Sequence, residues 1–229
     1  MKFGEEVRAF GVVLRLDDYL WFSSHEWGNN NETTALVHNY ALSFALSGSD
    51  RILAFGGVPD YERDLATLDV YCSPARLLAD QSIRQLRAVF TFNSIDGPTQ
   101  RTQALRIGEK VNDPKFGKRQ VLYPGLRFHF VAFTRNAFDL PRVFRLGKKR
   151  SPVVIETSKE LCGNTFEGTE QPNHAVNPLD VAGRVEDCIM HLMPPHMIYE
   201  EASIANDHFL RAGAEVFHIP KRVMQWRSP

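Results

Sequence analysis

Alternation of apolar and polar residues with a period of two recurs along this chain and constrains its fold more than any other feature. One face is apolar in each of three runs: Phe10, Val12, Leu14 and Leu16; Leu86, Ala88, Phe90 and Phe92; Leu126, Phe128, Phe130 and Ala132. This period is typical of strands that bury one face. Further apolar runs at 153–157, 188–192 and 215–219 predict more strands. The chain is therefore expected to be rich in sheet.

Helical periodicity is confined to two places in the sequence. The longer one places six apolar residues on one helical face and ends before Gly48: Leu36, Val37, Tyr40, Ala41, Phe44 and Ala45. A shorter helix is expected from Asp60, which can cap it while Leu65 and Leu68 face inward. Since strands outnumber helices, we predict an α+β fold with an antiparallel sheet, of which the ferredoxin-like arrangement is one common form. At 229 residues the chain suits one domain, 1–229, with an insertion.

The formal net charge of zero conceals a strongly basic middle segment. Residues 97–150 contain 13 Lys and Arg against 3 Asp and Glu, a local net charge of +10, so the remainder of the chain carries −10. A basic segment raises the local concentration of polyanions. This distribution favours a nucleic-acid partner, although a solvated basic face would give the same composition.

Part of this charge falls in a long connection between two predicted strands. The segment 95–125 spans about thirty residues, more than an ordinary hairpin loop, and its cations are Arg101, Arg106, Lys110, Lys115, Lys118 and Arg119. We expect either an arm that grips a nucleic-acid backbone or a surface loop without regular structure. Phe116 and Tyr123 are candidates to stack on bases in such an arm, or to pack at its foot.

A second basic cluster surrounds a glycine at 141–152. Its members are Arg142, Arg145, Gly147, Lys148, Lys149 and Arg150. Glycine permits close backbone approach, and Lys and Arg donate to phosphate oxygens, but many turns between strands have this composition. The sequence has neither a phosphate-binding loop motif nor a paired-glycine dinucleotide motif, which disfavours a nucleotide-hydrolysing or dinucleotide-dependent enzyme.

Segments along most of the chain resemble one protein family. They lie, in order, at 22–28 (FSSHEWG), 38–46 (HNYALSFAL), 58–65 (VPDYERDL), 140–152 and 177–180 (NPLD). In these segments the chain resembles the Cas-five proteins of CRISPR complexes, and most closely their type I-D branch, often called Csc-one. It departs from that branch at His25, where an arginine is expected.

The resemblance implies a ferredoxin-like, RNA-recognition-type antiparallel sheet with helices on one face and an inserted basic β-hairpin thumb, here at about 95–125. It implies a subunit of the type I-D Cascade complex that holds the 5′ handle of the CRISPR RNA. Its expected neighbours are the backbone subunit, the large subunit and target DNA near the protospacer-flanking motif. The residues expected to bind RNA are His25, Arg101, Lys110, Lys115, Phe116, Lys118, Arg119, Arg142, Arg145, Gly147, Lys148, Lys149 and Arg150.

Other functions stay open from the sequence. Metal-independent cleavage of precursor RNA needs a base and an acid, and His25, His38, His129 and Tyr123 have suitable side chains. A protein-only scaffold could use a helix at 34–46. A zinc site at Cys188 and His191 lacks the compact ligand pairs that such sites require. Three distant cysteines and the absence of a signal sequence or apolar span favour a reduced, cytoplasmic protein without cofactor or membrane contact.

Overall fold

The computed structural model describes residues 7–226 except 28–29, 49–59, 83–84 and 93–114. For 85–92 and 115–117 it describes the backbone only. The expected thumb residues Arg101 and Lys110 therefore lie outside the described residues, and Lys115 and Phe116 are described by their backbone alone.

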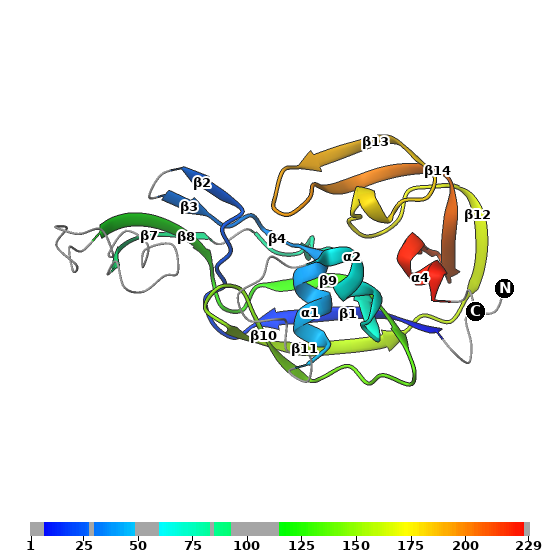
Figure 1. The fold of residues 1–229 in the computed structure, drawn as a ribbon, viewed down its shortest axis with the longest axis horizontal. Helices are drawn as coiled ribbons and strands as arrows, with labels where there is room; N and C mark the ends of the chain where they lie inside the picture. Colours follow the sequence, from blue (N-terminus) through cyan, green and yellow to red (C-terminus); the bar gives the residue numbers. More distant parts are fainter. Residues whose placement is uncertain (1–6, 28–29, 49–59, 83–84, 93–114, 227–229) are drawn as a thin grey trace.

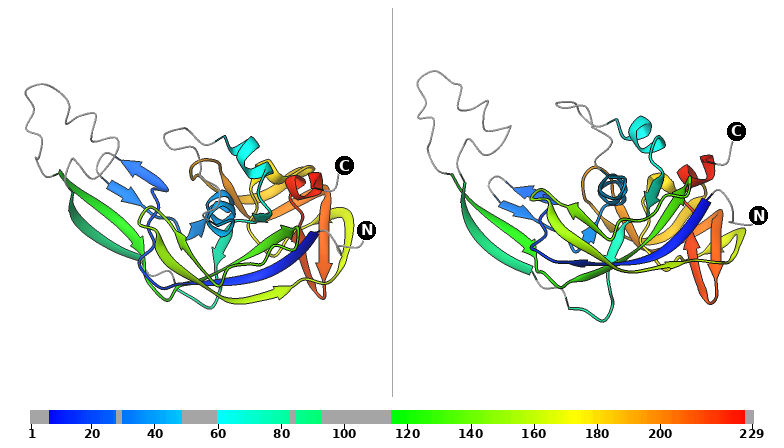
Figure 2. Two further views of the ribbon diagram at one scale, coloured as in Figure 1. Left: turned by 60° about the horizontal axis from the view of Figure 1, so that its bottom comes forward. Right: turned by 90° about the horizontal axis from the view of Figure 1, so that it is seen from below.

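A curled antiparallel sheet forms the body of the molecule (Figures 1 and 2). Its strand order is β10 (Val143–Leu146), β11 (Ser151–Glu160), β1 (Val7–Leu16), β9 (Arg127–Arg135), β6 (Ala75–Leu77) and β4 (Leu36–Val37), and β5 (Val70–Cys72) also pairs with β9. In β1, the predicted alternation is seen directly, since Val12, Leu14 and Leu16 are buried. Leu14 pairs with Phe128 of β9, so the two predicted strands share one buried face.

Two smaller sheets flank the body (Figure 1). One contains β12 (Asn164–Glu170), β14 (Ile198–Ala212), β13 (Arg184–His191) and β15 (Glu215–His218). The other contains β2 (His25–Trp27), β3 (Asn30–Glu32), β8 (Lys115–Leu122) and β7 (Gln85–Phe92). Strands β7 and β8 pair as an antiparallel hairpin that extends from the body. The predicted connection at 95–125 therefore contains a strand, β8, beside its undescribed part.

Helix α1 (Asn39–Leu46) lies on the concave face of the curled sheet (Figure 2), where Leu42 and Leu46 pack against Phe128 and Phe130. The prediction that this helix includes Leu36–Val37 is wrong, because those two residues form strand β4.

The remaining helices of the described residues are short: α2 (Tyr61–Ala66), the 3₁₀ turn η1 (Pro178–Asp180) and α4 (Lys221–Gln225). Asp60 caps α2 as predicted and accepts a hydrogen bond from Arg63 N at 3.2 Å. Within the described part of the chain, every helix is too short or too polar to span a bilayer. The observed fold is thus mostly antiparallel sheet with few helices, in agreement with the α+β prediction.

A buried polar network joins α1 to the turn at η1. The Asn39 side chain donates to Asp180 Oδ2 at 3.0 Å, and the Tyr71 hydroxyl donates to Asp180 Oδ1 at 2.7 Å. Asn177 Nδ2 donates to Asn39 Oδ1 at 3.1 Å. Burial raises the pKa of Asp180 to about 6, while the Tyr71 hydrogen bond opposes this. Two of the segments that carry the family resemblance, 38–46 and 177–180, are therefore in direct contact.

His174 makes the fold sensitive to acid. The ring is buried, with Nδ1 at 2.8 Å from the Ala175 carbonyl, and Nε2 accepts from the His218 backbone at 3.1 Å. Burial lowers the pKa of His174 to about 3. In the unfolded chain the His174 ring takes up a proton near the ordinary histidine pKa of about 6.5, so acidification favours unfolding. Between pH 7 and pH 5, we expect His174 to remove about 2 kcal/mol from the free energy of unfolding. In urea titrations the His174→Gln variant should lose less unfolding free energy between pH 7 and pH 5 than the natural chain. Equal losses would show that His174 is not the source of the acid sensitivity.

Candidate nucleic-acid interface

The basic cluster at 142–150 occupies the hairpin formed by β10 and β11. The turn runs from Gly147 to Arg150, whose N–H donates to the Gly147 carbonyl at 3.0 Å. Arg145 Nη1 donates to the Arg150 carbonyl at 3.2 Å and so braces the turn. Five cationic side chains of the hairpin are exposed: Arg142, Arg145, Lys148, Lys149 and Arg150. The turn therefore presents a concentration of positive charge to solvent.

Gly147 allows this turn to sit directly on the segment that follows β1. Its φ is +76°, a conformation that favours glycine, and a Cβ atom there would lie 2.7 Å from the Trp21 carbonyl oxygen. The same carbonyl accepts a hydrogen bond from Lys148 N at 2.9 Å. The glycine that the sequence analysis associated with close approach to a ligand thus makes a close approach to the chain itself.

Lys148 connects the turn to strand β2. Its Nζ lies 3.1 Å from Glu26 Oε1 and hydrogen-bonds the Ser23 hydroxyl. Hydrogen bonds from Ser23 and then from Lys148 lower the pKa of Glu26. Two further cations of the same turn, Lys149 and Arg150, are exposed.

Trp21 lies between cations from two distant segments. The guanidinium carbon of Arg119, from β8, lies 3.2 Å from the centre of the ring, and Lys148 Nζ lies 5.3 Å from it. Burial lowers the pKa of Arg119. Parallel pairing of β3 with β8, which sets Asn31 opposite Arg119, holds this strand in place. Trp21 therefore links Arg119 of β8 to Lys148 of the basic turn.

We expect the Arg119–Trp21 pair to be energetically coupled. A double-mutant cycle with Trp21→Leu and Arg119→Met should give a coupling energy of about 1–2 kcal/mol, because the pair is partly desolvated. The matched control is Arg211 over Phe166, at 4.6 Å, where the cation is more exposed. Urea unfolding of the single and double variants measures both couplings. Equal coupling at the two pairs would argue against a special role for Trp21.

Aromatic side chains lie beside these cations. The rings of His25 and Trp27, both on β2, stack with centroids 5.7 Å apart, and Trp27 is 59% exposed. Tyr123 contacts Tyr19 at 5.4 Å between centroids, and Tyr19 is 41% exposed. Base-stacking surfaces in nucleic-acid-binding proteins have this chemistry.

The structure brings together only part of the expected site. Arg119 of β8 and Lys148 of the β10–β11 turn meet at Trp21, and His25 lies on the nearby strand β2. Lys118 is adjacent to Arg119 in β8 and therefore faces the other side of that strand. Sequence reasoning missed the roles of four residues: Trp21, Ser23, Glu26 and Trp27. Three of them fall in the segment 22–28 and one directly precedes it. The family resemblance of that segment was therefore the feature of the sequence that could have pointed to these four residues.

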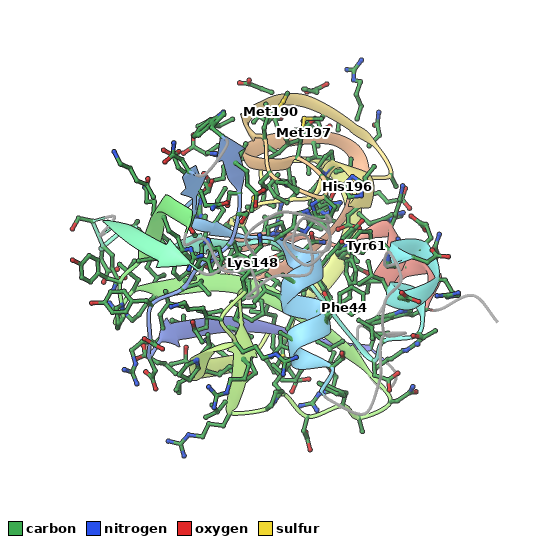
Figure 3. The ribbon with its side chains drawn as sticks, turned by 60° about the vertical axis from the view of Figure 1, so that its left-hand side comes forward. Phe44, Tyr61, Lys148, Met190, His196 and Met197 are labelled. Atoms are coloured by element: carbon green, nitrogen blue, oxygen red, sulfur yellow. The ribbon has the colours of Figure 1, made fainter. Side chains whose placement is uncertain are left out.

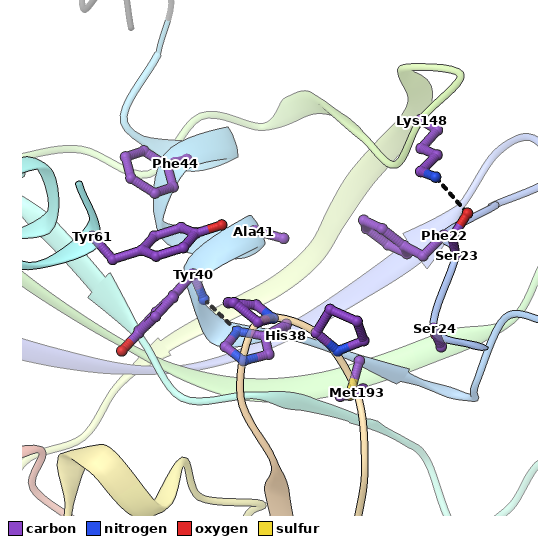
Figure 4. Close-up of a pocket in the computed structure, with 12 residues that line it drawn as sticks. Phe22, Ser23, Ser24, His38, Tyr40, Ala41, Phe44, Tyr61, Lys148 and Met193 are labelled. Carbon is purple, nitrogen blue, oxygen red and sulfur yellow. Dashed lines mark hydrogen bonds between the residues drawn. The ribbon is translucent and has the colours of Figure 1, made fainter. Parts of the chain in front are cut away.

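A cavity of about 270 Å³ opens beside Lys148, between the segment 22–24, helix α1, Tyr61 and the loop 193–195. Its walls are mostly aromatic or apolar (Figure 4). His38 lies at its floor and caps α1, with Nδ1 accepting from Tyr40 N at 3.2 Å. The prediction that His38 lies within the helix is therefore wrong by one position.

The candidate acid and base residues for RNA cleavage are dispersed. His25 is on β2, His38 caps α1, His129 is on β9 and Tyr123 follows β8. Burial lowers the pKa of His38 and of His129 to about 4, with a further contribution at His129 from Arg76. Both rings are therefore neutral at pH 7. Among the described residues, no group of three or more His, Cys, Asp or Glu is arranged to hold a metal ion.

Comparison with known proteins identifies one family. The family model described as "Type I-D CRISPR-associated protein Cas5/Csc1" matches residues 7–227. No curated protein matches the chain. Among solved structures, similarity is found to a chain of the type III-B Cmr-beta complex, determined by cryo-EM bound to cognate target RNA and AMPPnP. That match has 11% sequence identity and a TM-score of 0.48, and it covers 85% of this chain and 86% of the other.

Proposed function

Because the chain belongs to the type I-D CRISPR-associated Cas5/Csc1 family, we propose that it is a non-catalytic Cascade subunit that holds the 5′ handle of the CRISPR RNA. One observation carries the proposal. Arg119 of β8 and Lys148 of the β10–β11 turn meet at Trp21, beside the stack of His25 on the exposed Trp27.

This arrangement has the two kinds of contact that unpaired RNA requires. Cationic side chains follow the phosphate backbone, and aromatic rings stack on exposed bases. Lys149 and Arg150 project from a turn whose backbone is fixed by Gly147 and by the Lys148–Trp21 hydrogen bond. A rigid turn presents its charges without a large loss of conformational entropy on binding.

The strand order is compatible with a ferredoxin-like origin of the sheet. The adjacent strands β11, β1, β9 and β6 are antiparallel, and α1 connects the β1 side of the sheet to the β5–β6 edge. In this interpretation β10 stands at the point of the chain where the ferredoxin-like fold has its second helix. It is an edge strand of the sheet, paired with β11. The β7–β8 hairpin is the base of the thumb and would extend the RNA-binding surface through Lys115 to Arg119.

The remaining partners follow from the family and the charge distribution. We propose that the Cascade backbone subunit and large subunit contact the acidic part of the chain, outside residues 97–150. Target DNA near the protospacer-flanking motif would pass close to the basic segment 97–150. Assembly would take place in the cytoplasm. The neutral, buried state of His38 and His129 supports a binding role rather than acid–base cleavage of RNA.

Co-purification tests the proposal. The tagged chain is expressed with its genomic neighbours and a CRISPR array, and the bound RNA is sequenced. We expect uniform CRISPR RNAs that share a 5′ repeat-derived handle, together with the large and backbone subunits. Recovery of the chain with its protein partners but without RNA would overturn the RNA-holding role and favour a protein-only scaffold.

A further inference from the structure

The cavity beside Lys148 adjoins the basic turn, but most of its lining is aromatic or apolar. Four Phe and Tyr rings line it, from Phe22, Tyr40, Phe44 and Tyr61 (Figure 4). Met193, Pro194 and Pro195 are also part of the lining. Phe22, Phe44 and Tyr61 are only partly buried, so their rings are accessible from the cavity.

Polar groups stand at two places in this apolar lining. At one end, Lys148 Nζ is held by the Ser23 hydroxyl (Figure 4). At the floor, His38 is neutral, and because Nδ1 accepts a hydrogen bond, its proton is on Nε2. This N–H is buried and lies near the His196 backbone, so it is not accessible from the cavity. The cavity thus combines a cation at one end with aromatic and apolar walls.

The volume limits what can enter. About 270 Å³ is below the roughly 300–1,000 Å³ typical of pockets for drug-sized ligands. A single planar ring fits this space, and the aromatic walls offer it stacking surfaces. We propose that the cavity receives one unstacked nucleobase of the bound RNA, with the phosphate of that nucleotide at Lys148.

The inference rests on the proposed RNA-holding function and adds a base-binding site to it. Continuity with the basic turn favours a nucleobase over a side chain of a partner protein, because Lys148 belongs to both the turn and the cavity. Figure 3 shows Lys148, Phe44, Tyr61 and His196 around the same part of the surface. The rings of Tyr61 and His196 are 6.4 Å apart.

The test fills the cavity while it leaves every cation in place. Ala41 lines the cavity from α1, whereas Ala45 is on the same helix, partly exposed, and outside the lining. Ala41→Phe is the filling variant and Ala45→Phe its control. The probes are single-stranded RNAs of the repeat-derived handle sequence, each with 2-aminopurine at one position, titrated with the full-length protein.

We expect one position of the handle to change its 2-aminopurine emission when the natural chain binds. Ala41→Phe should abolish that change and weaken RNA binding about 5- to 100-fold, the effect of losing one stacked base. Ala45→Phe should retain both. Phe44→Leu, which keeps an apolar side chain but removes one ring, should reduce the emission change and provides a second test if Ala41→Phe does not fold.

The possible results separate the two proposals. RNA binding by the natural chain with no responsive position, or with a response unaffected by Ala41→Phe, would overturn the base-binding site and leave the RNA-holding role intact. Loss of a partner subunit from Ala41→Phe complexes with unchanged RNA binding would assign the cavity to a protein side chain and also overturn it. Absence of RNA binding by the natural chain, alone and in its complex, would overturn both proposals.

Discussion

Replacement of Gly147 by alanine should destabilise the protein by about 2–4 kcal/mol. Two costs combine at this position. The φ of +76° penalises any residue with a Cβ atom, and the added methyl would lie 2.7 Å from the Trp21 carbonyl oxygen and 2.8 Å from Leu20 Cδ1. The Trp21 carbonyl cannot easily retreat, because it is backbone and accepts the Lys148 hydrogen bond. Strain and overpacking of this kind each cost on the order of 1–3 kcal/mol.

Urea unfolding measures the loss, and Gly125→Ala is its matched control. Gly125 has a similar φ of +85° but no atom within 4 Å of its added Cβ. The Gly125→Ala variant should therefore lose only about 1 kcal/mol of unfolding free energy, the cost of the backbone conformation. Equal losses at Gly147 and Gly125 would show that contact with the Trp21 segment does not contribute.

Neutralising the basic turn should weaken RNA binding about 100-fold at 0.1 M salt. In the triple variant Lys148→Ala, Lys149→Ala and Arg150→Ala, three potential phosphate contacts are lost. Each contact to single-stranded RNA changes the log–log slope of affinity against salt by about 0.7, so the slope should become shallower by about 2. Filter binding or fluorescence anisotropy over a series of salt concentrations gives both quantities.

A control variant removes the same charge elsewhere. This second triple variant combines Arg63→Ala, Lys159→Ala and Arg184→Ala. The three side chains are exposed and lie on α2, β11 and β13, outside the basic turn. This control should change neither the affinity nor the slope by more than a small, general electrostatic effect. If the two triple variants behave alike, RNA binding depends on overall charge and the turn has no specific role.

Sequence periodicity predicted the strands that alternate without interruption. The runs that start at Phe10, Leu86 and Leu126 are confirmed as β1, β7 and β9. Strand β14 was missed although it is the longest, at 15 residues. Glu201 and Asn206 within it have φ values of +51° and +56°, and its pairing with β12 and β13 shifts register. Such irregularities break the period of two that the sequence analysis depended on.

The candidate site shows a different limit of sequence reasoning. Composition located the basic turn, since Lys148, Lys149 and Arg150 are adjacent in the chain. It could not place Trp21 against Arg119, because that contact depends on how β3 pairs with β8. The RNA-binding roles assigned to the site residues all stay predictions, and two of these residues, Arg101 and Lys110, lie outside the described part of the chain.

The long-range contacts at Trp21 also bear on when the protein becomes functional during its synthesis. Lys148 and Glu26 are 122 residues apart in the sequence, yet they form an ion pair in the folded chain. Proteins are made from the N-terminus at about 5–20 residues per second, so Trp21 emerges from the ribosome several seconds before its partners. A nascent chain that ends before β10 and β11 lacks the basic turn altogether. On the proposed RNA-holding function, capture of RNA has to wait until β11 (Ser151–Glu160) has been synthesised.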